Sequence, residues 1–405
     1  MSSPLPLSSG GSSATYGSAA PRVLTALGAV VFLAGLFVSP AGVWPNYLLA
    51  VFGLACTGLA GAVFVALHHV TGARWGNAIL RVPEAMLGIL PFAAGATAVL
   101  AFGAPTLYAW ADHATVAGDE ILEGRAAWMN VPFVLARAAL CYVVWIGLGS
   151  LLVRRSRRAV ERGDDASKAA AARAGVWFLL AFAPTFSVAC FDWVLSLDRH
   201  FESTMFALYH FAGLFLSGVA LVTILVIVAR RQGWLSATAV TEDVLHDLGK
   251  LLFAFTLMWG YLWFSQFMLI WYTNMPEETA YYLGRHAGGF APLAVANVLL
   301  NWTVPFLLLL PRSMKRSESV LLRVASLVLV GRWLDLYLGI DQPSQGATPV
   351  FGLWEIGLAV GAAGAFVWSW RRTWTNRSTG PSQEPVDVVA DAAGDTRFGL
   401  EGRTR

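Results

Sequence analysis

Residues 206–229 read FALYHFAGLFLSGVALVTILVIVA, without a single Asp, Glu, Lys or Arg. About 20 apolar residues in a helix cross the hydrocarbon core of a bilayer. Lipid offers no hydrogen-bond partner to the backbone, so a long unbroken apolar run is expected to be helical there. This stretch therefore predicts a transmembrane helix.

The chain contains ten such segments, which predict an all-α polytopic membrane protein of about ten transmembrane helices. They cover 23–40, 46–68, 84–106, 130–153, 174–197, 206–229, 250–273, 290–311, 319–340 and 350–370. The composition agrees, because 57% of residues are hydrophobic and only 13% are charged, against about 25% charged in a soluble domain. We expect a membrane domain over 23–370, with disordered cytoplasmic tails at 1–22 and 371–405.

The charges of the loops predict the orientation of the helices. The loop after the fourth segment reads RRSRRAVERGDDASKAAAAR, and the loops after the second, sixth and eighth segments are also basic, as is the start of the C-terminal tail. The alternate loops carry acids instead. Basic loops stay in the cytoplasm, so both termini are predicted to be cytoplasmic. The basic residues form no single patch, and no nucleic acid is expected as a partner.

This topology permits a simple internal arrangement. Helices 2–5 and helices 6–9 each begin on the outer side, so they could form two parallel four-helix bundles, with helices 1 and 10 at the periphery. No obvious sequence repeat requires this arrangement.

Ionisable side chains inside the predicted membrane segments are candidates for function, because each costs at least about 2.5 kcal/mol to insert. With the topology above they fall into an outer and an inner layer. The outer layer contains Arg137, Asp192, His210, Arg332 and Asp335, and the inner layer contains His68, Glu84, Asp247 and Lys250. Two layers of ionisable residues, separated by an apolar middle layer, suit a proton path with two half-channels. They also suit a quinone site near one membrane surface.

Each outer candidate also has a purely structural interpretation. Arg332 and Asp335 are three residues apart, which places them on one helix face as an ion pair. Arg137 could neutralise Asp192 at a similar depth. A single histidine on a helix, such as His210, is often a hydrogen-bonded packing residue.

Two of the inner candidates are open to the same kind of explanation. Glu84 and Asp247 each open a predicted helix, where an acid complements the helix dipole.

Motifs for an autonomous enzyme are missing from the sequence. A b-type haem needs two histidines at one depth on facing helices, whereas His210 is predicted on the outer side and His68 and His69 on the inner side. There is no CxxC, zinc or nucleotide-binding motif. We therefore predict no catalytic residue, no metal and no redox centre in this chain. The aromatic residues of the seventh segment could stack on a quinone ring or face the membrane interface.

Several stretches resemble one known family. These are HHVTGARWGNAILRVPEAML, WMNVPFVLAR, ACFDWVLSLDRHFESTMFALYHFAG, HDLGKLLFAFTLMWGYLWFSQFMLIWYTNMPEET and GRWLDLYL. Together they resemble the smaller quinone-binding-type membrane subunit of alternative complex III, a bacterial quinol:cytochrome c oxidoreductase. The resemblance covers roughly 60–360 in the same order, and the tails lie outside it.

The resemblance implies a fold like the polysulfide-reductase-type membrane subunit, in the bacterial cytoplasmic membrane. It also implies partners: a larger homologous membrane subunit, an iron–sulfur subunit and c-type cytochrome subunits, which would carry the iron–sulfur clusters and haem c. A quinone or quinol is the implied ligand of the assembly. The expected function is then quinol-linked electron transfer to a cytochrome c or another periplasmic acceptor, with proton translocation.

Within that function, the outer candidates would form one proton-conducting or quinone-proximal cluster, and the inner candidates its cytoplasmic mouth. Two other functions remain open. The chain could be a structural anchor for the outer redox subunits. It could also be a secondary transporter, for which Pro184 and Pro305 inside predicted helices are a weak indication.

Overall fold

The computed structural model describes residues 19–199, 201–236, 238–286, 288–340 and 348–378. Throughout these residues the secondary structure is helical, with no strand. Nine helices in this part of the chain are long and apolar enough to cross a membrane. The prediction of an all-α polytopic membrane protein is confirmed.

The membrane-length segments are single helices or consecutive helical pieces. The single helices are α1 (Ala20–Val38), α2 (Pro40–Val70), α7 (Val131–Arg162), α8 (Asp165–Trp193), α9 (Phe206–Arg231), α10 (Glu242–Thr273), α15 (Glu318–Ile340) and α17 (Leu353–Ser378). One composite segment consists of α3 (Arg81–Met86), η1 (Leu87–Ile89) and α4 (Leu90–Leu107), and the other of α12 (Ala291–Val298), η5 (Leu299–Thr303) and α13 (Val304–Leu309).

Helix α15 corresponds to the ninth predicted segment but is not among the nine apolar helices. It has 23 residues, which is long enough to cross the membrane. It also carries Arg323, Arg332 and Asp335 near its middle and ends. These charges distinguish α15 from the nine apolar helices. Two of the charged residues, Arg332 and Asp335, form an ion pair with each other. An ion pair of this kind carries no net charge into the membrane.

The helices pack as two groups. The first bundle contains α2, the α3–α4 segment, α7 and α8, and the second bundle contains α9, α10, the α12–α13 segment and α15. Helices α2 and α9 contact each other between the bundles, and their apolar windows are the most deeply buried, at 83% and 78%. These two helices therefore form the centre of the molecule.

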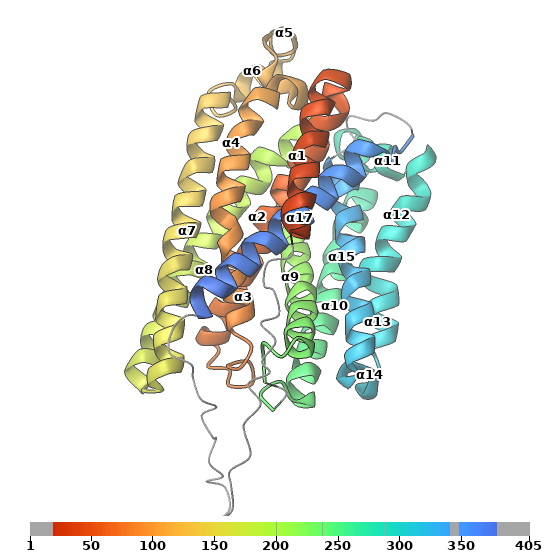
Figure 1. The fold of residues 1–405 in the computed structure, drawn as a ribbon. Helices are drawn as coiled ribbons and strands as arrows, with labels where there is room; N and C mark the ends of the chain where they lie inside the picture. Colours follow the sequence, from red (N-terminus) through yellow and green to blue (C-terminus); the bar gives the residue numbers. More distant parts are fainter. Residues whose placement is uncertain (1–18, 200, 237, 287, 341–347, 379–405) are drawn as a thin grey trace, which may run out of the picture.

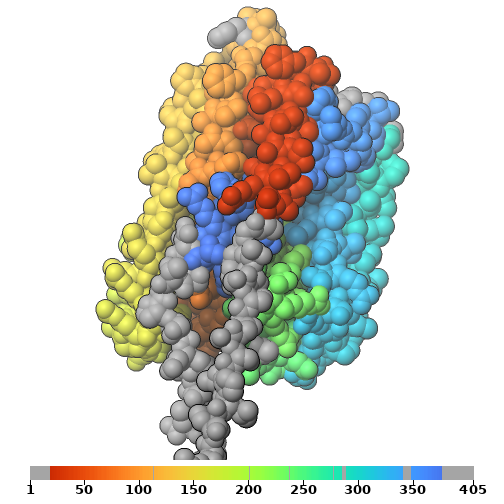
Figure 2. All heavy atoms as spheres, in the orientation of Figure 1, coloured from red at the N-terminus to blue at the C-terminus, as the bar shows by residue number. Residues whose placement is uncertain are grey.

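Helices α1 and α17 cross the outside of the bundles (Figure 1). They make an extensive contact with each other, and α17 also packs on α2 and α3. A Cβ atom on Gly28 of α1 would lie 2.6 Å from the Cα of Gly361 on α17. Glycine at both positions thus lets the two backbones approach closely. Figure 2 shows α1 on the surface, with α17 on the same face of the molecule.

The short helices mark the two ends of the molecule. Helices α5 (His113–Val116), α6 (Glu120–Arg125) and α11 (Pro276–His286) lie at one end, and α14 (Arg312–Arg316) lies at the other (Figure 1). The remaining short turns are η2 (Ala109–Ala111), η3 (Leu195–Leu197) and η4 (Gly288–Phe290). The acid-rich loops and the basic loop at α14 are therefore at opposite ends, as the loop charges require. Which end faces the cytoplasm stays a prediction.

Several helix ends differ from the predicted ones: α7 extends to Arg162 rather than 153, and α8 begins at Asp165 rather than 174. Helix α10 begins at Glu242 rather than near 250, because Thr241 caps it by accepting a hydrogen bond from the Val244 amide. Helix α1 begins at Ala20, inside the predicted tail 1–22.

At the other end of the chain, α17 extends to Ser378, inside the predicted tail 371–405. Trp374 holds this extension by stacking on Trp370, with ring centroids 5.3 Å apart. The remaining tail residues, 1–18 and 379–405, lie outside the described part of the chain.

Candidate functional site

Asp335 of α15 accepts hydrogen bonds from three side chains in the second bundle. Arg332, one turn earlier on α15, forms a close ion pair with it, and the Tyr209 hydroxyl of α9 donates to its Oδ1. The Asn297 Nδ2 of α12 also donates to Oδ1, at 3.0 Å. Asp335 is 6% exposed. A carboxylate only accepts hydrogen bonds, so this buried donor set suits a charged Asp335. The predicted pairing of Arg332 with Asp335 is confirmed.

The same guanidinium reaches His210 of α9. Arg332 Nη2 lies 3.3 Å from His210 Nδ1. Arginine has no acceptor, so Nδ1 must accept this bond, and a neutral ring then carries its proton on Nε2. A Cβ atom on Gly213, one turn after His210, would lie only 2.9 Å from Arg332 Nε. Glycine at this position leaves the space that the guanidinium occupies.

An irregular helical turn supplies the amides of the cluster. The π-helical turn η5 follows α12 and is followed by Pro305, near the start of α13. Asn301 in this turn donates from Nδ2 to Asn297 Oδ1 at 2.7 Å, and Asn297 in turn donates to Asp335. Asn301 is 0% exposed. The π-turn thus extends the hydrogen-bond chain that ends on Asp335, and such turns are frequent at functional sites.

We call this set the Asp335 cluster. It contains Tyr209, His210, Asn297, Asn301, Arg332 and Asp335.

Arg137 and Asp192 form a separate ion pair in the first bundle. Arg137 Nε of α7 lies 2.7 Å from Asp192 Oδ2 of α8, which confirms the predicted neutralisation. Arg137 Nη1 also donates to the Trp128 carbonyl at 2.9 Å. The guanidinium carbon lies 4.2 Å from the Trp128 ring centroid and 4.5 Å from that of Phe133. Two helices, two rings and a backbone carbonyl therefore hold this pair.

The two outer sites are divided by Phe52 of α2. Its ring centroid lies 5.7 Å from that of His210 and 6.2 Å from that of Trp193, the residue after Asp192. Phe52 is itself buried. The outer candidates were predicted to form one cluster. The structure brings His210, Arg332 and Asp335 together, whereas Arg137 and Asp192 form a separate pair, and the Phe52 ring lies between the rings of His210 and Trp193.

The inner candidates also separate into two places. Glu84, in the first turn of α3, accepts hydrogen bonds from Ser156 and Arg157 of α7, at 2.6 and 3.0 Å. Asp247 instead pairs with Lys250 on α10, at 2.5 Å, and both side chains are partly exposed. Asp247 lies in the second turn of α10, so it does not open the helix as predicted. Asp247 and Lys250 form a surface pair of the second bundle.

His68 and His69 have different partners. His68 Nε2 lies 2.9 Å from Asn77 Oδ1 in the loop after α2. His69 Nε2 lies 2.8 Å from Ser156 Oγ, and thereby joins the Glu84 group. His69, rather than the predicted His68, is the histidine that this hydrogen-bond chain connects to Glu84.

The aromatic residues of α10 face in two directions. Trp263 stacks between Trp259 and Phe267, with centroid distances of 6.5 and 5.9 Å. Tyr261 and Trp271 are instead 68% and 70% exposed on the outer surface of the helix. These three rings form a continuous stack along α10, in which Trp259 is buried and Trp263 and Phe267 are partly exposed.

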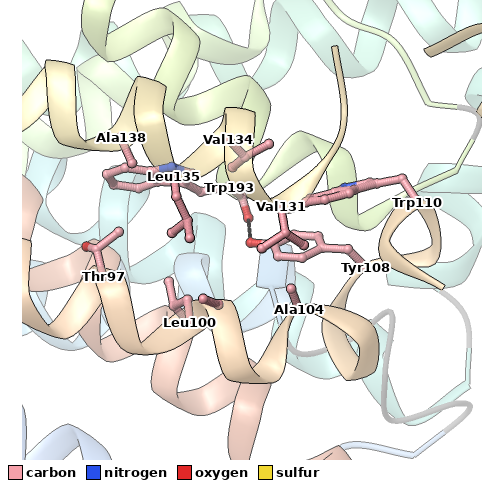
Figure 3. A pocket seen from close by; sticks show the side chains of 11 residues that line it. Thr97, Leu100, Ala104, Tyr108, Trp110, Val131, Val134, Leu135, Ala138 and Trp193 are labelled. Carbon is pink, nitrogen blue, oxygen red and sulfur yellow. Dashed lines mark hydrogen bonds between the residues drawn. The ribbon is translucent and has the colours of Figure 1, made fainter. Parts of the chain in front are cut away.

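A small apolar groove of about 30 Å³ lies between α4 and α7 (Figure 3). Its two hydroxyl groups are already bonded: Tyr108 donates to the Trp193 carbonyl at 2.9 Å, and Thr97 lies 2.8 Å from the Tyr142 hydroxyl. Burial and the nearby Asp192 charge raise the pKa of Tyr108 above its usual range. The indole Nε1 of Trp110, which also lines the groove, is a buried donor without a hydrogen-bond partner in the described structure.

A short internal match escaped the sequence analysis. Residues 192–198 read DWVLSLD and residues 335–341 read DLYLGID, with Asp at the first and last positions and Leu at the fourth. Asp192 and Asp335 each belong to the last helix of a bundle. This match could have indicated that the two acids are counterparts. Tyr209 and Ser156 had no comparable signal, because their partners come from helices distant in sequence.

No known protein family matches the chain, and no curated protein matches it. Within the described ranges, no group of three or more His, Cys, Asp or Glu side chains could hold a metal ion.

Proposed function

We propose that this chain is a membrane subunit of a quinol-oxidising electron-transfer complex of the alternative complex III type, and that Asp335 exchanges protons during turnover. The support comes from the sequence resemblance, the multi-span helical fold and the Asp335 cluster. The observation that carries the proton role is the buried carboxylate with three donors, connected through Arg332 to a histidine.

The charges around Asp335 explain how it would hold a proton only briefly. Adding a proton to the carboxylate removes the counter-ion of Arg332, which is 4% exposed. An uncompensated charge in a low-dielectric interior costs several kcal/mol, on the order of 3–5. A protonated Asp335 is neutral and leaves the Arg332 charge unbalanced, so release of the proton restores the ion pair. Tyr209 and Asn297 then hold the carboxylate in place.

The partners would supply the redox chemistry. Quinol oxidation releases protons and electrons together. In this proposal the iron–sulfur and c-type cytochrome subunits carry the electrons, and the larger membrane subunit binds the quinol. The Asp335 cluster contributes a proton site within the membrane.

Affinity purification of the tagged chain from native membranes tests the assignment to a complex. We expect copurifying subunits with the optical spectrum of haem c and the electron paramagnetic resonance signals of reduced iron–sulfur clusters. Isolation of the chain without redox subunits under mild detergent would contradict it, and solute transport by that chain in liposomes would favour a transporter.

Variants of the assembled complex test the proton role. Asp335→Asn should assemble but lose quinol-driven proton release. Asp165→Asn, which alters a solvent-exposed acid paired only with Lys168 at the surface, is the matched control. Unchanged proton release in both variants would favour a structural anchor.

A further inference from the structure

Three side chains from three helices form a short hydrogen-bond chain at the basic end of the first bundle. His69 is near the end of α2, Ser156 lies on α7 and Glu84 lies on α3. His69 Nε2 is 2.8 Å from Ser156 Oγ, and Ser156 Oγ is 2.6 Å from Glu84 Oε1. Each step is within ordinary hydrogen-bond distance.

The chemistry of the groups fixes the direction of these bonds. The Glu84 carboxylate only accepts, so the Ser156 hydroxyl donates to it. The remaining lone pairs of Ser156 Oγ can then accept from His69, whose Nε2 must carry a hydrogen. Every donor hydrogen in this chain therefore points from His69 towards Glu84.

The two ends of this hydrogen-bond chain differ in solvent exposure. His69 is partly exposed, whereas Ser156 is 0% exposed and Glu84 is 1% exposed. Arg157 Nε, at 3.0 Å from Glu84 Oε2, holds the other carboxylate oxygen. The chain thus connects an accessible imidazole to an acid that water reaches poorly.

The neighbouring histidine is not in this line. His68 bonds to Asn77, and its ring meets the His69 ring edge-on with centroids 5.6 Å apart. His68 therefore packs against the His69 ring, and the hydrogen-bond chain to Glu84 passes through His69.

We propose that His69, Ser156 and Glu84 form a proton relay that loads Glu84 from the basic face of the protein. The Nε2–H bond of the His69 imidazolium breaks as its proton passes to Ser156 Oγ, and the Ser156 hydroxyl proton passes to Glu84 Oε1. The products are a neutral His69, an intact Ser156 hydroxyl and a protonated Glu84. The relay deepens the proposed function, since a proton-coupled membrane subunit needs an uptake route, but its test needs no quinol and no partner.

The experiment uses the full chain in lipid vesicles with the basic loops facing the bulk solution. A flash releases a proton from a photolabile acid, and time-resolved infrared spectroscopy records the carboxylic acid band that Glu84→Gln removes. Ser156→Ala should slow the appearance of this band at least about ten-fold, since positioned proton transfer typically contributes 10²–10⁴. Ser156→Thr, which keeps the hydroxyl, should restore the rate.

Two further variants separate a relay from a merely structural hydrogen bond. Ser217→Ala is the matched control, because Ser217 is also buried but bonds only to carbonyls of its own helix; it should not change the rate. His69→Ala should slow the band, and added imidazole should recover it. An unchanged rate in Ser156→Ala, or no recovery of His69→Ala by imidazole, would overturn the relay. Neither result depends on Asp335 or on assembly with redox subunits, so the proposed function would be judged separately.

Discussion

Each bundle has a buried arginine–aspartate pair in the described part of the chain, and the two pairs have different surroundings. Arg137 and Asp192 join two neighbouring helices, and aromatic rings cover the guanidinium. Arg332 and Asp335 belong to one helix, so this ion pair does not connect two helices. Their hydrogen bonds instead reach other helices through Tyr209, His210 and Asn297.

This difference separates a structural pair from a chemical one. A pair that joins two helices and is closed by rings stabilises packing. A pair whose carboxylate is bonded to a hydroxyl, an amide and, through arginine, an imidazole has groups that can exchange or reorient protons. Under the proposed function, the two bundles use a similar pair of residues for different purposes.

The largest expected difference is in proton-coupled turnover. Asp335→Asn removes the carboxylate from the cluster and should lower turnover of the assembled complex about 100-fold, the lower end of general acid–base effects. Asp192→Asn should leave turnover within about three-fold of wild type, once the amount of folded complex is equalised. The turnover of both variants is measured in complexes prepared in the same way. Equal losses of turnover would contradict the proposed difference between the two ion pairs.

The next effect concerns stability in the first bundle. Arg137→Met leaves Asp192 buried without its partner, and breaking such a pair costs about 3–5 kcal/mol. The double variant Arg137→Met with Asp192→Leu should recover most of that loss, because apolar residues of similar size can replace a buried pair. Chemical denaturation in detergent measures both. A double variant as unstable as the single one would show that the charges themselves are required.

A smaller effect is expected from crowding the Arg332 guanidinium. Gly213→Ala places a methyl group within 2.9 Å of Arg332 Nε, and overpacking of this kind costs about 1–3 kcal/mol. Turnover should fall about ten-fold, in line with a cost near 1.4 kcal/mol. Gly147→Ala is the control, since nothing lies within 4 Å of a Cβ atom there. Equal turnover in the two variants would mean that the position of Arg332 is unimportant.

The smallest effect is expected at an exposed acid on the helix that carries Asp192. Asp164 caps α8, and hydrogen bonds from Ser167 lower the pKa of its carboxyl. A lowered folded-state pKa contributes stability above the unfolded value, and this is lost as pH falls through the folded value. The melting temperature of Asp164→Ala should therefore be slightly below wild type at neutral pH, and the gap should close in acid. A gap independent of pH would contradict this.

The sequence alone predicted those features that depend on one helix or one loop. Apolar runs such as 206–229 predicted the membrane helices, because lipid requires an internally bonded backbone. The three-residue spacing of Arg332 and Asp335 predicted their pairing for the same local reason. The extension of α17 was missed because Trp374 contacts residues distant in sequence: its ring centroid lies 6.4 Å from that of Trp234 and 5.2 Å from the Arg81 guanidinium carbon.

The remaining site residues come together only in the folded chain. Asn297 is 38 residues from Asp335 and Tyr209 is 126 residues from it. Neither has a local pattern that marks it as a partner. The division of the outer candidates by Phe52 was equally invisible, because an apolar residue on α2 gives no sign that it stands between two charged sites.

The most direct test of the account is quinol-driven proton release from the reconstituted complex carrying Arg332→Met with Asp335→Leu. Replacing a buried ion pair by apolar residues is often neutral or stabilising, so the complex should assemble. The account predicts that this double variant releases no protons, while Arg137→Met with Asp192→Leu releases them at nearly the wild-type rate. Proton release at the wild-type rate in the Arg332 and Asp335 double variant would contradict it.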